Sequence, residues 1–242
     1  MSNIVHGPGF LMLDNLLAPE ELCAVQLYMQ FENYTPVHAN GWSKAWRVND
    51  GQPLSSGSYL CGRGGKKIAP SQQNAINIVA ERILSLESEI DSFLEKFLEW
   101  DFISLTTFLY PNGAGLGWHE DDCQYKGAFI FYAHPEWKPS WGGELCIAGE
   151  VSENSGLPEK IYQYDADIFE MSGVGSGSIG PEFGWTRRER SISDNGIGTW
   201  IYPKPNRLVI IKPGYSHCIK KVEADAGENM RCSVTGFFQK SN

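Results

Sequence analysis

The chain has 242 residues, of which 42% are hydrophobic and 20% are charged, so it can bury a large core and is not expected to be disordered. Its formal net charge of -9 disfavours a polyanionic partner, and we expect no binding to nucleic acid. The six cysteines form no CxxC pair, and no run of roughly 18 apolar residues or signal-like N-terminus occurs. These features predict a cytoplasmic protein that has reduced thiols and no membrane contact.

The pattern of residues 1–100 predicts a mixed, largely helical N-terminal part that supports the rest of the domain. Residues 9–17 are typical of a short strand and turn, and PEELCAVQLYMQFE, directly after them, has the acidic first turn and apolar spacing of a helix. Residues 42–65 have no clear periodicity and fit either strands or a loop. From Pro70 to about Leu98, apolar residues recur at threes and fours, which predicts one long helix.

From residue 101 to residue 242 the pattern changes to short runs that are typical of strands, bounded by Gly, Pro or charged turns. The runs are FISLTTFLY, GAFIFYA, GELCIAG, RLVIIKP and RCSVTGFFQ. Residues 150–206 interrupt them with a long Gly/Ser-rich segment, which we expect to be an insertion that acts as a lid or binding loop. We therefore predict a single domain over residues 1–242, mainly β with flanking helices.

The segment GWHEDDC contains a candidate pair of metal ligands. If it is a strand, His119 and Asp121 project from one face, whereas Glu120 and Asp122 point away and are interpreted as structural. A ferrous centre commonly uses two histidines and a carboxylate, and His217, which follows the strong strand pattern RLVII, is the natural third ligand. Taken alone, an HxD pattern is often a surface feature and a single histidine is often a core residue.

Arg231 and Ser233 share one face of the last predicted strand. The guanidinium can pair both oxygens of a carboxylate while the serine hydroxyl adds a neutral donor. Because Arg231 lies between apolar residues, it needs a carboxylate from the protein or from a ligand. This pair suits a dicarboxylate whose other end chelates the metal.

Taken in order, these motifs resemble the iron(II)- and 2-oxoglutarate-dependent dioxygenases, most closely their prolyl 4-hydroxylase-like branch. The resemblance covers about residues 102–239: Tyr110 nine residues before His119, the HxD pair, FIFYAHPEW followed by GGEL, His217, and RCS before TGFF. It implies a double-stranded β-helix core of the jelly-roll or cupin-like type. It also implies Fe(2+) bound by the two histidines and Asp121, with 2-oxoglutarate and O2 as co-substrates. The residues implied for 2-oxoglutarate binding are Arg231, Tyr132, Ser233 and Tyr110.

The resemblance implies oxidation of a C–H bond, most often hydroxylation, with release of succinate and CO2. Asp121 disfavours halogenation, because related halogenases have a small residue at that position. We favour a small-molecule substrate, such as an amino acid or a natural-product intermediate, because a long lid suits a closed site. The alternatives are a peptidyl prolyl or other protein side-chain hydroxylase on the same fold, and a non-catalytic cupin-like protein that binds metal or carboxylate.

Further residues are candidates for substrate contact. Trp118 can line the site, as can Trp42 and Trp46, although each can equally fill core. The charge run of Arg187, Arg188 and Arg190 can recognise an anionic group, although such runs are more often solvated. Tyr132 is also an acceptable core aromatic. His134 begins a predicted turn and is expected to be exposed.

Overall fold

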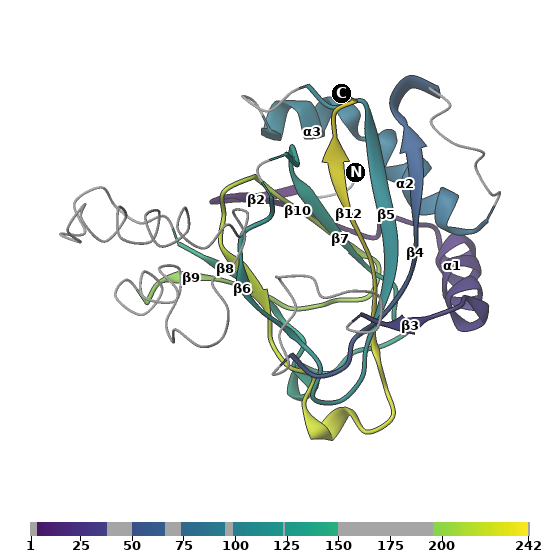
Figure 1. The fold of residues 1–242 in the computed structure, drawn as a ribbon, viewed down its shortest axis with the longest axis vertical. Coiled ribbons are helices and arrows are strands. Elements are labelled where there is room, and N and C mark those ends of the chain that lie inside the picture. The colour runs from purple at the N-terminus through teal and green to yellow at the C-terminus, as the bar shows by residue number, and fades with distance from the viewer. Residues whose placement is uncertain are drawn as a thin grey trace, which may run out of the picture.

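The computed structural model describes residues 4–37, 50–65, 74–94, 99–122, 124–149 and 196–241. Two antiparallel sheets organise these residues (Figure 1), one of eight strands in the order β1-β2-β10-β7-β12-β5-β4-β3 and one of four in the order β6-β11-β8-β9. The strands are β1 (Ile4–Gly7), β2 (Phe10–Asp14), β3 (Thr35–Pro36), β4 (Leu54–Gly62), β5 (Phe102–Tyr110), β6 (Leu116–His119), β7 (Ala128–Tyr132), β8 (Leu145–Ala148), β9 (Gly198–Ile201), β10 (Arg207–Ile211), β11 (His217–Ile219) and β12 (Arg231–Gln239). The helices are α1 (Pro19–Phe31), α2 (Ile76–Leu84) and α3 (Glu87–Leu94). The predicted mainly β fold with flanking helices and a jelly-roll core is confirmed.

The two faces of the larger sheet have different partners, as Figure 1 shows: the helices lie on one side and the smaller sheet on the other. In β7, Phe129 and Phe131 join the cluster that includes the helices, whereas Ile130 and Tyr132 join the cluster that includes β8 and β9. This alternation follows from the two-residue period of a strand. A run as apolar as AFIFY is therefore explained by burial on both faces.

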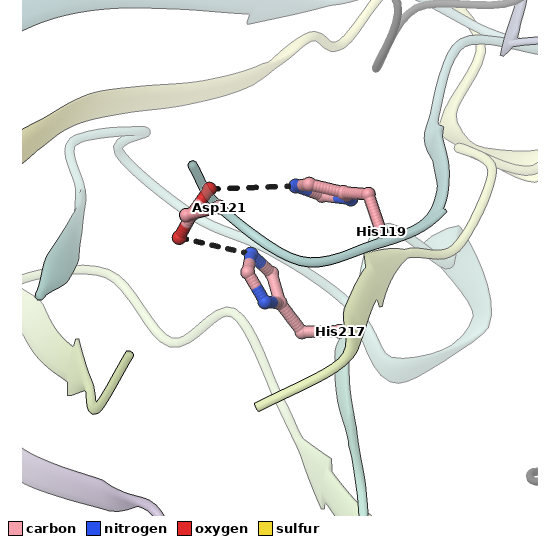
Figure 2. A group of neighbouring side chains, drawn as sticks. All are labelled: His119, Asp121 and His217. Atoms are coloured by element: carbon pink, nitrogen blue, oxygen red, sulfur yellow. Dashed lines mark ion pairs between the residues drawn. The ribbon is translucent and has the colours of Figure 1, made fainter. Parts of the chain in front are cut away.

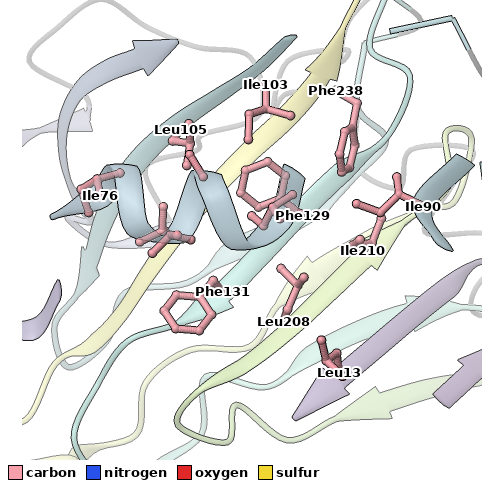
Figure 3. Packing of buried hydrophobic residues seen from close by; sticks show 14 of the residues in the cluster. Leu13, Ile76, Ile90, Ile103, Leu105, Phe129, Phe131, Leu208, Ile210 and Phe238 are labelled. Atoms are coloured by element: carbon pink, nitrogen blue, oxygen red, sulfur yellow. The ribbon is translucent and has the colours of Figure 1, made fainter. Parts of the chain in front are cut away.

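The helix-side core is closely packed around β12 (Figure 3). Phe129 and Phe238 meet edge to face, with ring centres 5.6 Å apart, and α2 contributes Ile76 to the same cluster. Gly236 of β12 is the cross-strand partner of Phe129 and has no room for a side chain. An added Cβ would lie 1.7 Å from the carbonyl oxygen of Ser104 and 2.5 Å from the Phe129 ring. The glycine in TGFF is therefore required by packing.

The helix predicted from Pro70 to Leu98 is two helices in the structure, so this prediction is wrong in its continuity. The break between α2 and α3 falls at Ser85 and Leu86, where the Ser85 hydroxyl donates to the carbonyl oxygen of Arg82 at 2.7 Å. A serine that bonds the preceding turn competes with the helical ladder. Residues 70–73 and 95–98 lie outside the described part of the chain.

Both the N-terminal support and the end of the predicted insertion contribute strands to the sheets. The N-terminal part extends the larger sheet as well as supporting it, because β2 pairs with β10 and β4 pairs with β5. The end of the predicted insertion is strand β9, which pairs with β8 from Leu145 to Ala148. Residues 150–195 lie outside the described residues, so the lid remains a prediction. Among the described helices, none has the length and apolar character needed to span a membrane.

Candidate metal and carboxylate site

Strands β6 and β11 place the two candidate histidine ligands side by side. His119 and His217 are direct cross-strand partners, with ring centres 4.3 Å apart. Strand β6 ends at His119, so Asp121 lies in the following loop. The sequence pattern suggests that the two residues share one face of a strand. The chain instead turns after His119 and brings the carboxylate back to both rings (Figure 2).

The three side chains converge through specific atoms. Asp121 Oδ1 lies 3.8 Å from His119 Nε2, and Asp121 Oδ2 lies 3.7 Å from His217 Nε2. One ligand atom from each residue lies within 4.8 Å of the others. These separations are close to the roughly 3–4 Å expected between ligands of one ion whose bonds are about 2.0–2.2 Å long. The donor set therefore fits a single metal ion.

The backbone orients both imidazole rings for metal binding. His119 Nδ1 lies 2.8 Å from the carbonyl oxygen of Gly117, and His217 Nδ1 lies 2.9 Å from that of Tyr215. A carbonyl can only accept a hydrogen bond, so in the neutral ring each Nδ1 carries the proton. The lone pair of each Nε2 is then available to a metal ion, an arrangement that is typical of metal-binding histidines.

A second group of polar side chains lies on three neighbouring strands of the larger sheet. We call it the carboxylate cluster, and it consists of Arg231, Ser233, Tyr110 and Tyr132. Strand β12 lies between β5 and β7, with Arg231 opposite Tyr110 and Ser233 opposite Tyr132. All four side chains are buried. Their alternation with Cys232 and Val234, which pack on the helix side, places Arg231 and Ser233 on the face toward the smaller sheet.

Arg231 is buried with hydrogen-bonding capacity left over. Its Nε donates to the Gly143 carbonyl at 2.8 Å and its Nη1 to Ser233 Oγ at 3.3 Å, and the guanidinium carbon lies 4.9 Å from the ring centres of both tyrosines. Within the described residues, Arg231 Nη2 and the Tyr132 hydroxyl are buried without a hydrogen-bond partner. A buried, unpaired cation costs several kcal/mol, and a ligand carboxylate would satisfy both groups.

The two tyrosines are held in their neutral form. Burial raises the pKa of Tyr110 and of Tyr132, and the nearby Arg231 charge opposes the increase in both cases. Tyr132 therefore keeps its proton at neutral pH and can donate it in a hydrogen bond to a carboxylate.

Gly143 makes the position of Arg231 possible. It adopts a φ of +72°, and an added Cβ would lie 2.8 Å from Arg231 Cδ. Any other residue would combine backbone strain with a collision. The role of this glycine in GGEL was missed from the sequence, where the pair of glycines was the available signal.

The metal ligands and the carboxylate cluster are linked through the core between the sheets. Ile147 of β8 is the cross-strand partner of His217 and packs in one cluster with Tyr132 and Leu145. This apolar cluster therefore joins β8, the strand paired with His217, to Tyr132 of the carboxylate cluster.

The remaining candidates are placed less directly. Trp118 is partly exposed and, as the strand neighbour of His119, projects toward the opposite face of β6. The candidates Arg187, Arg188, Arg190, Trp42 and Trp46 lie outside the described residues.

The prediction that His134 is exposed is wrong. Its side chain is buried, with Nε2 2.7 Å from the Pro203 carbonyl oxygen and its ring centre 4.8 Å from that of Trp137. Burial lowers its pKa to about 4, so it is neutral at pH 7. The partner of its Nε2 comes from a distant segment, which local sequence patterns do not reveal.

Comparisons with known proteins bear on the family and the fold. A family model of the 2OG-Fe(II) oxygenase superfamily matches residues 105–239. The comparison with curated proteins gives no match.

Many solved structures are similar in fold, and three of them illustrate the likeness. A prolyl-4-hydroxylase from Pseudomonas putida has a TM-score of 0.57 at 16% identity, covering 97% of this chain and 94% of its own. A prolyl hydroxylase from Trichoplax adhaerens, in complex with a peptide fragment of the hypoxia inducible factor oxygen degradation domain, has a TM-score of 0.51 at 17% identity, covering 96% and 84%. The epimerase SnoN, in complex with Fe3+, alpha ketoglutarate and nogalamycin RO, has a TM-score of 0.50 at 9% identity, covering 96% and 79%.

Proposed function

The chain belongs to the 2OG-Fe(II) oxygenase superfamily, and we propose that it hydroxylates a C–H bond of a small molecule at a metal site formed by His119, Asp121 and His217. It is a 2-oxoglutarate-dependent oxygenase whose cofactors are Fe(II) and 2-oxoglutarate. Family membership favours this enzyme over the non-catalytic binding protein that the sequence left open.

The convergence of two imidazoles and one carboxylate supports the proposed site most strongly. Three protein ligands leave coordination positions for the 2-oxo acid and for oxygen. When bound, iron would supply the oxidising chemistry with O2 as the oxidant: one oxygen atom enters succinate as 2-oxoglutarate loses CO2, and the other hydroxylates the substrate C–H bond. In this proposal the protein keeps each Nε2 available for the metal through the Gly117 and Tyr215 carbonyls.

The carboxylate cluster has the complementary role of orienting the co-substrate. Arg231 Nη2 and the Tyr132 hydroxyl would each donate to the carboxylate remote from the metal, and both are buried without a hydrogen-bond partner among the described residues. Holding that end fixed would place the 2-oxo acid against the metal and reduce the entropy cost of reaching the reactive geometry. Burial of the cluster would also exclude water and strengthen the ionic contact.

The proposed substrate is a small molecule, and a peptide is the second candidate. The small-molecule choice rests on the long segment 150–195 between β8 and β9, and SnoN offers a precedent on this fold for action on a natural product. The two similar prolyl hydroxylases are the observation that favours a peptide. Substrate contacts by Trp118 and by Arg187, Arg188 and Arg190 stay predictions.

The first test of the proposed site is an anaerobic titration with Fe(II) and then 2-oxoglutarate, followed through the visible metal-to-ligand charge-transfer band. We expect the band in the wild type and its loss in His119→Ala, Asp121→Ala and His217→Ala. A folded Asp121→Ala protein with an unchanged band would remove this ligand assignment.

The substrate class needs a separate experiment. Succinate release above the uncoupled rate can be compared across a panel of amino acids and natural-product intermediates and a panel of proline-containing peptides. Stimulation by the peptides alone would overturn the small-molecule proposal and leave the metal site intact.

A further inference from the structure

A side-chain hydrogen bond joins the two segments that carry the candidate metal ligands. Ser216 Oγ donates to Glu120 Oε1 at 2.7 Å, and both residues are partly buried. Glu120 lies between His119 and Asp121 in the sequence, and Ser216 directly precedes His217. The bond therefore connects the segments immediately beside all three ligands.

The pair occupies the point at which the backbone ladder ends. His119 and His217 are the last partners of β6 and β11, so Glu120 and Ser216 would form the next antiparallel rung. Strand β6 is also at the edge of its sheet, and its register with β11 shifts between His217 and Ile219. The end of β6 that carries His119 is therefore weakly held by backbone pairing alone. Asp121 lies beyond this end, outside the paired strand.

We propose that Glu120 and Ser216 are a positioning pair, whose hydrogen bond holds the loop that carries Asp121 at the distance from His217 that iron binding needs. This inference rests on the proposed metal site. Glu120 is not in the group of side chains whose ligand atoms lie close enough to share one metal ion, so the pair acts through the backbone and does not ligate the metal. Partners just outside a ligand shell typically change metal affinity by roughly 10- to 100-fold when removed.

Two kinds of substitution separate the hydrogen bond from its alternatives. Ser216→Ala and Glu120→Ala remove the bond from either side, whereas Ser216→Thr keeps the hydroxyl and Glu120→Gln keeps an acceptor oxygen without the charge. Asp122→Ala is the matched control for loss of a nearby negative charge, because its carboxylate accepts from the backbone N–H of Gln124 and not from the β11 side.

The test is Fe(II) affinity of each purified variant under anaerobic conditions with saturating 2-oxoglutarate, read from the charge-transfer band, with thermal unfolding of the metal-free protein measured in parallel. We expect both alanine variants to bind Fe(II) roughly 10- to 100-fold more weakly. The double alanine variant should be little worse than either single one, because both remove the same bond. Ser216→Thr and Asp122→Ala should stay within about twofold of the wild type, and Glu120→Gln should bind more tightly than Glu120→Ala.

The possible results separate the pair from the metal site. If folded Ser216→Ala and wild type bind Fe(II) equally, the positioning pair is refuted. The same holds if only the Glu120 and Asp122 variants weaken binding, which would indicate charge alone. If the wild type itself fails to bind, or His217→Ala binds as well as the wild type, the proposed metal site fails and the pair fails with it.

Discussion

Replacing Arg231 by methionine tests the most unusual feature of the structure, a fully buried guanidinium with no ion-pair partner among the described residues. Methionine has a similar length and no charge, so it fills much of the same space. The change removes the bonds to Gly143 and Ser233 and the unused Nη2 donor, and it leaves the metal ligands unaltered.

The substitution affects the ligand-bound and the ligand-free protein differently, and the expected changes in 2-oxoglutarate affinity and in stability follow from this difference. Truncating one partner of a buried charge pair costs about 2–5 kcal/mol, so the 2-oxoglutarate dissociation constant should increase at least tenfold, which corresponds to about 1.4 kcal/mol. In the ligand-free protein, relief of a buried unpaired charge offsets the cost of about 1–3 kcal/mol for leaving the Gly143 carbonyl without its donor. The free energy of unfolding without ligand should therefore change much less than the binding free energy.

The assay is an anaerobic 2-oxoglutarate titration at saturating Fe(II), paired with chemical denaturation in the absence of ligand. The charge-transfer band should keep its shape and require more 2-oxoglutarate to develop. Arg82→Met is the matched control, because Arg82 is a half-exposed arginine that pairs with Glu21 on the surface. An unchanged 2-oxoglutarate requirement in Arg231→Met would show that another residue anchors the co-substrate.

Three further predictions follow from packing and titration. Gly143→Ala should raise the 2-oxoglutarate requirement, because the added Cβ would lie 2.8 Å from Arg231 Cδ at a φ of +72°, and an unchanged binding curve would contradict this role. Ile147→Ala should leave a cavity between the sheets and lower the free energy of unfolding, measured by denaturant titration, by about 2–5 kcal/mol. A loss well below that range would show that neighbouring side chains relax to fill the cavity. His134 has a folded pKa of about 4 against an ordinary value of 6.5, so the unfolded chain binds more protons between these values and stability falls as the pH decreases from about 6.5 to 4. Denaturation of wild type and His134→Gln across this range should show a shallower pH dependence in the variant, and equal slopes would refute the assignment.

The strand pattern allowed much of the site to be predicted. Because side chains alternate in strands, RCS places Arg231 and Ser233 on one face whatever the rest of the fold, and the structure has them on the same face of β12. Their partners Tyr110 and Tyr132 depend on the register of β5 and β7 against β12, which is set by segments far apart in the sequence. Only the resemblance to a known family supplied those two residues.

The errors have a common physical origin in contacts between distant segments. Pairing Asp121 with His119 on one face supposes a strand through both residues, but β6 ends at His119 and the loop beyond it is connected to Ser216 through Glu120. The pattern around His134 predicts an exposed turn, but the side chain is buried and its Nε2 donates to the Pro203 carbonyl. The cytoplasmic location, the absence of nucleic-acid binding and the substrate class stay predictions, since nothing in the described geometry bears on them.

The arrangement of the two sheets sets the central requirement of the proposed mechanism. The metal ligands are attached to the smaller sheet and its following loop, whereas the carboxylate cluster lies on central strands of the larger one. A co-substrate held at both ends must span the separation between them, and the apolar core that contains both Ile147 and Tyr132 helps to set that separation. Packing between the sheets is therefore part of co-substrate recognition, because a change of spacing would weaken one end of the contact even if every polar residue remained.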